Sequence, residues 1–269
     1  MKIKTLIVGI GFISLTTPAL AQSVFTGFYG QVSTGYESNQ LGSLSSSGTT
    51  IPNANSDTKG SAPSQNFGGA PLVLGAGYYW QASDKWLIGV GVDYSALSQT
   101  SSTFSRDTTN APGNTAIVAG ETLTYNGASL QLSNRFNLFV TPAYAIDKDK
   151  LVYLKAGYSQ VTAQFNRPTS ATKTLNGGST TTATIGGSQS SNQGGYLLGL
   201  GYKQMITSGL YGFVEGNYMG YSAPSYSINT TTRANETLHG VNSTGTRTLT
   251  QNFASLNTFQ ALVGVGYAF

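Results

Sequence analysis

The chain contains no cysteine and only one histidine. Without cysteine there is no disulfide, no thiolate nucleophile and no Cys-ligated metal site. The single histidine, His239, has no second His or Cys with which to share a metal ion. The sequence therefore gives no reason to expect a cofactor or a metal.

Charged residues are also scarce. They make up 9% of the chain, against roughly 25% in ordinary soluble domains. The net charge of +4 is too small to indicate a nucleic-acid partner. After the first residues, no segment has the run of about 20 apolar residues that a transmembrane helix needs.

The first residues have the pattern of a secretory signal. A short basic start is followed by an apolar stretch over residues 5–15 and by the small residues Ala19 and Ala21. The apolar stretch is too short to cross a bilayer, so it predicts a cleaved signal rather than an anchor. We expect cleavage between Ala21 and Gln22, which leaves one domain over residues 22–269.

The last residues alternate between two kinds of side chain. Side chains point to opposite faces along a strand, so this alternation gives one apolar face and one small or polar face. Such a strand suits a barrel wall with lipid outside and a packed or wet lumen inside. The apolar face carries Phe259, Ala261, Val263, Val265, Tyr267 and Phe269.

Seven more segments with period-two alternation precede the closing strand, and each contains aromatic residues and glycine. The eight predicted strands are Gly27–Glu37, Pro71–Gln81, Trp86–Ser98, Leu123–Ile146, Leu151–Phe165, Gln193–Gln204, Leu210–Ser222 and Ser255–Phe269. They indicate an all-β fold, namely an eight-stranded antiparallel up-and-down transmembrane barrel.

The connections alternate in length. Residues 82–85, 147–150 and 205–209 are short turns, whereas 38–68, 99–122, 166–191 and 223–254 are long tracts rich in Ser, Thr, Asn and Gly. Short turns at one end and long loops at the other are typical of outer-membrane barrels. The turns are thus expected in the periplasm and the loops outside the cell. Their composition predicts mobile loops that bury no core.

Two strands contain ambiguous positions. Alternation in the fourth strand places Leu130 and Leu132 outward, with Ser129, Gln131 and Ser133 inward, and it leaves Asn134 on the lipid face. A bulge at Asn134, or a position at the upper interface, would explain this residue. In the seventh strand, Gly212, Gly216 and Gly220 either mark a broken register or form a shallow outward groove.

This pattern resembles the OmpA-like and OmpX-like superfamily of eight-stranded outer-membrane barrels, over the whole of Gly27–Phe269. The resemblance rests on the architecture and on the closing strand, which is similar to the C-terminal signal read by the barrel assembly machinery. It implies contact with outer-membrane lipids and lipopolysaccharide. The periplasmic domain of full-length OmpA proteins has no counterpart in this chain, so cell-wall tethering is not implied.

The lumen is where the sequence places most of its strand charges. Asp93, Arg135, Lys155 and Glu215 point inward, with Glu37 nearer the loops and Lys203 nearer the turns. Eight strands enclose a space that side chains fill, and buried charges must be paired. We expect an Asp93–Arg135 pair at one level and Lys155 with Glu215 at a lower one.

Three functions agree with these features. The leading hypothesis is a non-enzymatic barrel that displays polar loops for adhesion to a host or surface ligand, or that supports envelope integrity. A narrow ion or small-solute pore of the porin kind is the alternative. A lipid A-modifying enzyme that uses His239 is a remote third.

The closing strand leads to a prediction about biogenesis. Deleting Phe269 should lower the surface level of the protein, because Phe259, Val263, Val265, Tyr267 and Phe269 form the expected assembly signal. Surface labelling of intact cells measures this level. Normal surface display of the deleted protein would contradict the assignment.

Overall fold

The computed structural model describes residues 23–51, 58–110, 121–175, 177–178, 180–184, 186–232 and 245–269. The signal residues Ala19, Ala21 and Gln22 and the loop residue His239 lie outside these ranges. Among the described residues, no helix is long and apolar enough to cross a membrane.

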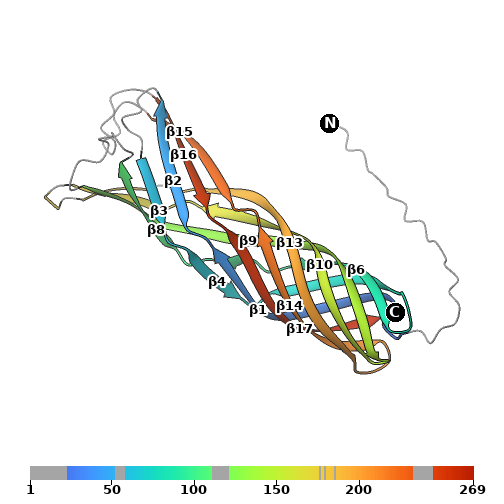
Figure 1. The fold of residues 1–269 in the computed structure, drawn as a ribbon. Coiled ribbons are helices and arrows are strands. Elements are labelled where there is room, and N and C mark those ends of the chain that lie inside the picture. The colour runs from blue at the N-terminus through green and yellow to red at the C-terminus, as the bar shows by residue number, and fades with distance from the viewer. Residues whose placement is uncertain are drawn as a thin grey trace, which may run out of the picture.

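Eight strands form a closed antiparallel ring, as the sequence predicts (Figure 1). The ring runs β1–β5–β6–β9–β10–β13–β14–β17 and returns to β1. Its strands are β1 (Gly27–Leu41), β5 (Leu72–Gln81), β6 (Trp86–Ser95), β9 (Thr122–Asp147), β10 (Lys150–Asn166), β13 (Ser188–Met205), β14 (Leu210–Tyr221) and β17 (Leu256–Ala268).

The closing seam joins the first and last strands. Its pairing extends from Tyr29 opposite Ala268 to Leu41 opposite Leu256. The backbone N–H of Phe269 continues this pairing by donating to the carbonyl of Phe28 at 2.9 Å. Closure leaves this part of the sheet with no free edge.

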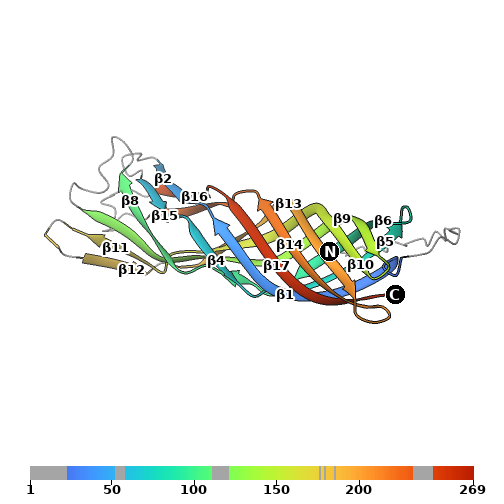
Figure 2. The ribbon, with the colours of Figure 1, turned by 60° about the horizontal axis from the view of Figure 1, so that its bottom comes forward.

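The polar tracts contain strands, which corrects the expectation of mobile loops. Together with the upper part of β9 they form a second sheet, called here the extension, in the order β12–β11–β9–β8–β3–β2–β16–β15. It lies at the end opposite the tight turns (Figures 1 and 2). Its elements besides β9 are β2 (Leu44–Ile51), β3 (Thr58–Ala62), β8 (Phe104–Asn110), β11 (Ser170–Thr174), β12 (Thr180–Thr184), β15 (Ser225–Thr232) and β16 (Gly245–Phe253).

Two short strands strengthen the junction between the ring and the extension. β4 (Gln65–Gly69) pairs with the upper part of β1, and β7 (Gln99–Thr100) pairs with β9. The composition argument failed because Ser, Thr and Asn were judged as loop residues. Threonine is also a good strand residue, and here the alternate positions of these tracts carry enough apolar side chains to bury.

A bulge at Asn134 changes the facing of β9. The residue has a φ of 50°, and the register with β10 slips between Gln160 and Thr162. Leu130 and Leu132 consequently point inward, where they are buried, and Gln131 and Ser133 point outward. The predicted facing of this half-strand was therefore wrong, because one extra residue moves every side chain beyond it to the other face.

β14 has no such slip. Its pairing with β13 and with β17 is continuous along its length, so the broken-register alternative is excluded. Gly212 and Gly216 lie on the outer wall, and a Cβ at Gly216 would meet nothing within 4 Å. A Cβ at Gly220, in contrast, would lie 2.7 Å from the ring of Tyr196. The open space at Gly216 agrees with the alternative of a shallow outward groove, whereas the ring of Tyr196 covers Gly220.

The bulge leads to a prediction about stability. Asn134→Val should destabilise the barrel by about 1–2 kcal/mol, because a β-branched residue is strained at positive φ. Asn134→Gly should cost less, since glycine accepts this φ and only the bond from Tyr94 Oη to the Asn134 side chain is lost. Urea unfolding in lipid vesicles measures both. Equal stability of the valine variant and the wild type would contradict this account.

Candidate functional site

The lumen is filled by layers of inward side chains that differ in chemistry. Starting at the end with the tight turns, an aromatic layer surrounds Lys203, a charged layer surrounds Lys155, a second charged layer surrounds Arg135, and an apolar layer follows. Each layer takes side chains from strands on different sides of the ring. The contacts within each layer show what the lumen can do.

The aromatic layer holds a buried ammonium group. Lys203 Nζ lies 4.1 Å from the ring centre of Tyr29, 4.7 Å from that of Tyr211 and 5.2 Å from that of Tyr79. It donates hydrogen bonds to Gln31 Oε1 at 3.2 Å and to Tyr211 Oη at 3.4 Å. Cation–π contacts of this kind stabilise a desolvated ammonium group by about 2 kcal/mol or more. Ring faces and an amide therefore hold this cation in place.

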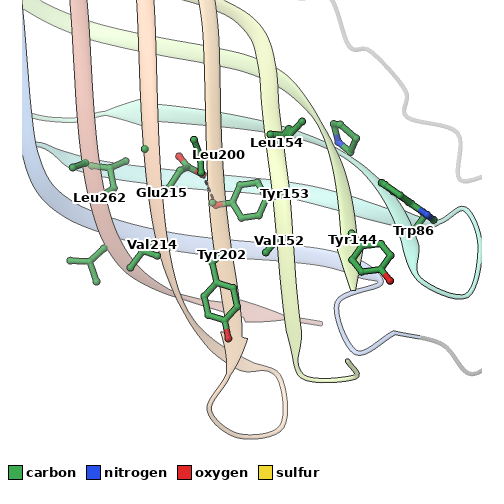
Figure 3. Close-up of a pocket in the computed structure, with 15 residues that line it drawn as sticks. Trp86, Tyr144, Val152, Tyr153, Leu154, Leu200, Tyr202, Val214, Glu215 and Leu262 are labelled. Atoms are coloured by element: carbon green, nitrogen blue, oxygen red, sulfur yellow. Dashed lines mark hydrogen bonds between the residues drawn. The ribbon is translucent and has the colours of Figure 1, made fainter. Parts of the chain in front are cut away.

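The next layer is a charge triad. Lys155, from β10, lies between Asp93 of β6 and Glu215 of β14, and it forms ion pairs with both. The Lys155 Nζ–Glu215 Oε1 distance is 2.9 Å. Tyr153 Oη also donates to Glu215, at 2.6 Å (Figure 3), and Asn217 does so at 2.7 Å. The triad carries one negative charge in excess, and Tyr153 and Asn217 give it hydrogen bonds.

The second charged layer is built around Arg135 of β9. Its guanidinium forms an ion pair with Glu37 of β1 and donates to Tyr221 Oη at 2.9 Å. It also reaches Asn39 and Thr258, each at 3.3 Å. Glu37 and Arg135 are 2% and 3% exposed, so their pairing replaces the water that both have lost.

The expected Asp93–Arg135 pair is not formed. Asp93 lies opposite Asn137 on the neighbouring strand, and Arg135 lies opposite Ser95. Both charges instead find partners across the lumen, which is narrow enough for long side chains to bridge. The sequence placed Lys155 and Glu215 on the same level, and the structure brings them together. The prediction for Asp93 and Arg135 considered only adjacent strands and left out ion pairs that reach across the lumen.

The uppermost layer is apolar and closes the lumen towards the extension. Phe165 is fully buried, with its ring centre 5.5 Å from that of Tyr226 and 5.9 Å from that of Phe253. Tyr226 Oη donates to the carbonyl of Ala163 at 2.9 Å, and burial raises the pKa of this phenol. The layer also contains Leu41, Leu130, Leu132, Val161, Leu197, Met219 and Leu256. Sequence reasoning missed this layer, although Val161, Ala163 and Phe165 alternate with polar residues.

The outer wall of the ring is apolar, in contrast to the polar side chains that fill much of the lumen. It has exposed aliphatic residues such as Leu138, Leu154 and Val263. Aromatic side chains border this belt at both levels: Phe28, Trp80, Trp86, Tyr267 and Phe269 at the turn end, and Tyr36, Tyr94, Phe136, Tyr158, Tyr196, Tyr218 and Phe259 at the other. An apolar band between two aromatic girdles fits a lipid bilayer.

Several solved structures are similar to this chain. The outer membrane protease OmpT from Escherichia coli has a TM-score of 0.45 at 10% identity, covering 93% of this chain and 99% of that one. The outer membrane protein OprG from Pseudomonas aeruginosa has a TM-score of 0.45 at 14% identity, covering 91% and 96%. Ail of Yersinia pestis, crystallised with a heparin analogue, has a TM-score of 0.33 at 11% identity, covering 87% of this chain and 99% of that one. No family model and no curated protein matches the chain.

Identities and TM-scores this low carry no argument about what this chain does. The closed ring and its two girdles are the decisive features. The protein is an outer-membrane β-barrel. Its apolar belt contacts membrane lipid, its tight turns face the periplasm, and its extension stands outside the cell.

Outside the cell, the polarity of the wall is inverted. On six strands of this region a set of outward positions carries Ser, Thr, Asn or Gln. Inward side chains of β9, β10, β15, β16 and β2 contribute to the apolar layer, whereas the inward positions of upper β13 are the polar Gln189, Ser191 and Gln193. We call these outward positions the polar face. They are Gln131 and Ser133 on β9; Thr162, Gln164 and Asn166 on β10; Ser188, Ser190 and Asn192 on β13; Ser225, Ser227 and Asn229 on β15; Thr248, Thr250 and Asn252 on β16; and Ser45, Ser47 and Thr49 on β2.

The closing-strand residues lie on the lipid side. Phe259, Val263, Val265, Tyr267 and Phe269 are all exposed, and Phe269 is 80% exposed at the periplasmic end. This is the facing that alternation predicted. It leaves their side chains accessible to a partner during assembly, and that role stays a prediction.

A shallow apolar groove of about 810 Å³ crosses the periplasmic half of the lipid-facing wall (Figure 3). Trp86, Leu154, Tyr202 and Val214 line it together with Gly216. Most of the lining belongs to the surrounding belt, and Tyr153 and Glu215 of the charged layer also contribute. Among the described residues, no group of three or more His, Asp or Glu residues can hold a metal ion.

The charge triad leads to a prediction about stability. Lys155→Met should destabilise the barrel by about 3–5 kcal/mol, because Asp93 and Glu215 lose their common counter-ion in a buried site. The triple variant Asp93→Asn, Lys155→Met, Glu215→Gln should recover most of that loss. Urea unfolding in vesicles measures both changes.

Lys150 provides the matched control. It forms a 2.9 Å ion pair with Asp147 in a periplasmic turn, with side chains 42% and 44% exposed. Because exposed pairs contribute little, Lys150→Met should cost under about 1 kcal/mol. Similar losses in the Lys155 and Lys150 variants would show that the triad does not stabilise the lumen.

Proposed function

We propose that this protein is a non-enzymatic outer-membrane scaffold that holds a rigid β-sheet extension above the cell surface for contact with an external partner. The observation that carries this proposal is the filled lumen. Its aromatic, charged and apolar layers follow one another from the periplasmic end to the extension. A barrel filled in this way is a firm base for the extension above it.

The layers count against the pore alternative. A pore needs a continuous wet path, and the apolar layer around Phe165 interrupts any such path with fully buried side chains. The charged groups beneath it already bind one another across the lumen. These groups hold opposite walls together, so their role in the proposal is structural.

The extension supports the display role. It is paired strand to strand from β12 to β15 and packs on the apolar layer. Its surface is therefore presented in one shape, so binding of a partner costs little conformational entropy for ordering the extension. Assembly of the barrel through the closing strand, by the barrel assembly machinery, belongs to the same proposal.

The pore alternative leads to a prediction about conductance. Purified protein reconstituted in planar bilayers should show no steady single-channel conductance, because the layers leave no wet path. Arg135→Ala removes one bridge across the lumen and should leave the bilayer silent as long as the apolar layer stays packed. Steady conductance that changes in Arg135→Ala would overturn the scaffold proposal.

Cells provide the complementary measurement. Deleting the gene should reduce attachment to surfaces and leave the uptake of small solutes unchanged, and restoring the wild-type gene should restore attachment. Loss of solute uptake with normal attachment would instead favour the pore.

A further inference from the structure

The polar face has an unusual composition for a binding surface. None of its positions carries a charge, an aromatic ring or an aliphatic side chain. The charged residues of the extension begin beside it, with Lys59 on β3 and Asp107 on β8, followed by the ion pair of Lys173 with Glu121. Lys59 lies opposite Ser47 of the polar face, and Arg167, whose N–H donates to the carbonyl of Gly187 at 2.9 Å, follows Asn166 on β10. Charged residues thus border the polar face without occupying its positions.

The face is also ordered in rows across neighbouring strands. On one row Ser47 lies opposite Thr250, which lies opposite Ser227. The hydroxyls of Ser227 and Thr250 are 3.3 Å apart, and on the next row Thr248 donates to Asn229 at 2.9 Å. Side chains on one strand face repeat about every 6.8 Å, and neighbouring strands are about 4.8 Å apart. The result is a grid of hydroxyl and amide groups.

The grid continues across the gap between β13 and β15. Gln189 Nε2 donates to the carbonyl of Ser227 at 3.0 Å, and the N–H of Ser222 donates to the carbonyl of Gly194 at 3.0 Å. On the β10 and β13 side, Thr162 donates to Asn192 at 3.0 Å. One surface therefore extends over six strands without a charged break.

The chemistry of this grid excludes several partner classes. Nucleic acids and sulfated polymers are bound by Lys and Arg, which are absent from its positions. Protein interfaces depend on buried aromatic and Arg anchors, which are also absent. A lipid surface would need an apolar patch. A partner that fits must itself present regular, uncharged hydroxyl groups.

We infer that the polar face binds extended chains of neutral polysaccharide. This inference rests on the proposed display function and names its partner class. Hydroxyl and amide groups on successive rows exchange hydrogen bonds with the hydroxyls of successive sugar units. Each such bond contributes little against water, so binding depends on many rows acting together and on many copies on one cell.

The test uses full-length protein in lipid nanodiscs and measures its retention on microcrystalline cellulose. We expect retention of the wild type to change little between about 0.05 and 0.5 M NaCl, because neither the positions of the polar face nor the cellulose chains carry a charge that salt screens. Soluble dextran sulfate, an anionic polymer, should not compete. Retention that falls steeply with salt, or no retention on cellulose, would overturn the inference.

Variants connect retention to the grid. The triple variant Ser47→Ala, Thr250→Val, Ser227→Ala removes one row of hydroxyls from the surface and should lower retention about tenfold, since the contacts act together. The control Ser105→Ala, Thr109→Val, Ser170→Ala makes the same changes on β8 and β11 and should retain wild-type binding. Equal retention of the two variants would contradict a role for the grid.

The two proposals fail in different ways. If cells with the protein attach to surfaces better than deletion cells, but the nanodisc protein does not bind cellulose, the display function stands and the neutral-polysaccharide assignment is wrong. If the protein promotes no attachment and the bilayers conduct, the display function itself is wrong.

Discussion

The narrowness of an eight-stranded ring is the constraint on which the rest of this structure depends. The enclosed space is only wide enough for side chains, so the inward charged groups must find their partners among other inward groups. Lys155 forms ion pairs with two carboxylates from other strands, Arg135 reaches Glu37, and Lys203 contacts the faces of aromatic rings. These bridges cross the lumen and join walls that the sheet hydrogen bonds connect only around its circumference.

A second constraint follows from the change of solvent along the barrel axis. Within the membrane the apolar side chains must point outward, and above it they must point inward. β10 achieves this by changing its sequence pattern, from Leu154 and Tyr158 outward to Val161 and Phe165 inward. β9 achieves it with the Asn134 bulge, which shifts the facing by one residue. Both solutions occur near the outer aromatic girdle.

This inversion connects the architecture with the proposed function. Because the apolar layer begins where the membrane ends, the extension has a core of its own, and the polar tracts become a folded sheet. The layer that closes the lumen is the same layer that supports the extension. A packed support of this kind counts against an open channel, in keeping with the proposed display function.

The sequence by itself determined the barrel, its strand number, its short turns and the outward facing of the closing strand. Those features depend on local alternation and on connection lengths, which are readable along the chain. The sequence also placed Lys155 level with Glu215, and the two form an ion pair. Tertiary structure alone decided the partners of Asp93 and Arg135, because both reach across the lumen rather than to neighbouring strands. It also decided the facing of Leu130 and the folding of the polar tracts, since one bulge and the packing around Phe165 set both. Such outcomes depend on distances between segments far apart in sequence, so alternation along the chain could suggest a bulge at Asn134 but could not choose between the alternatives.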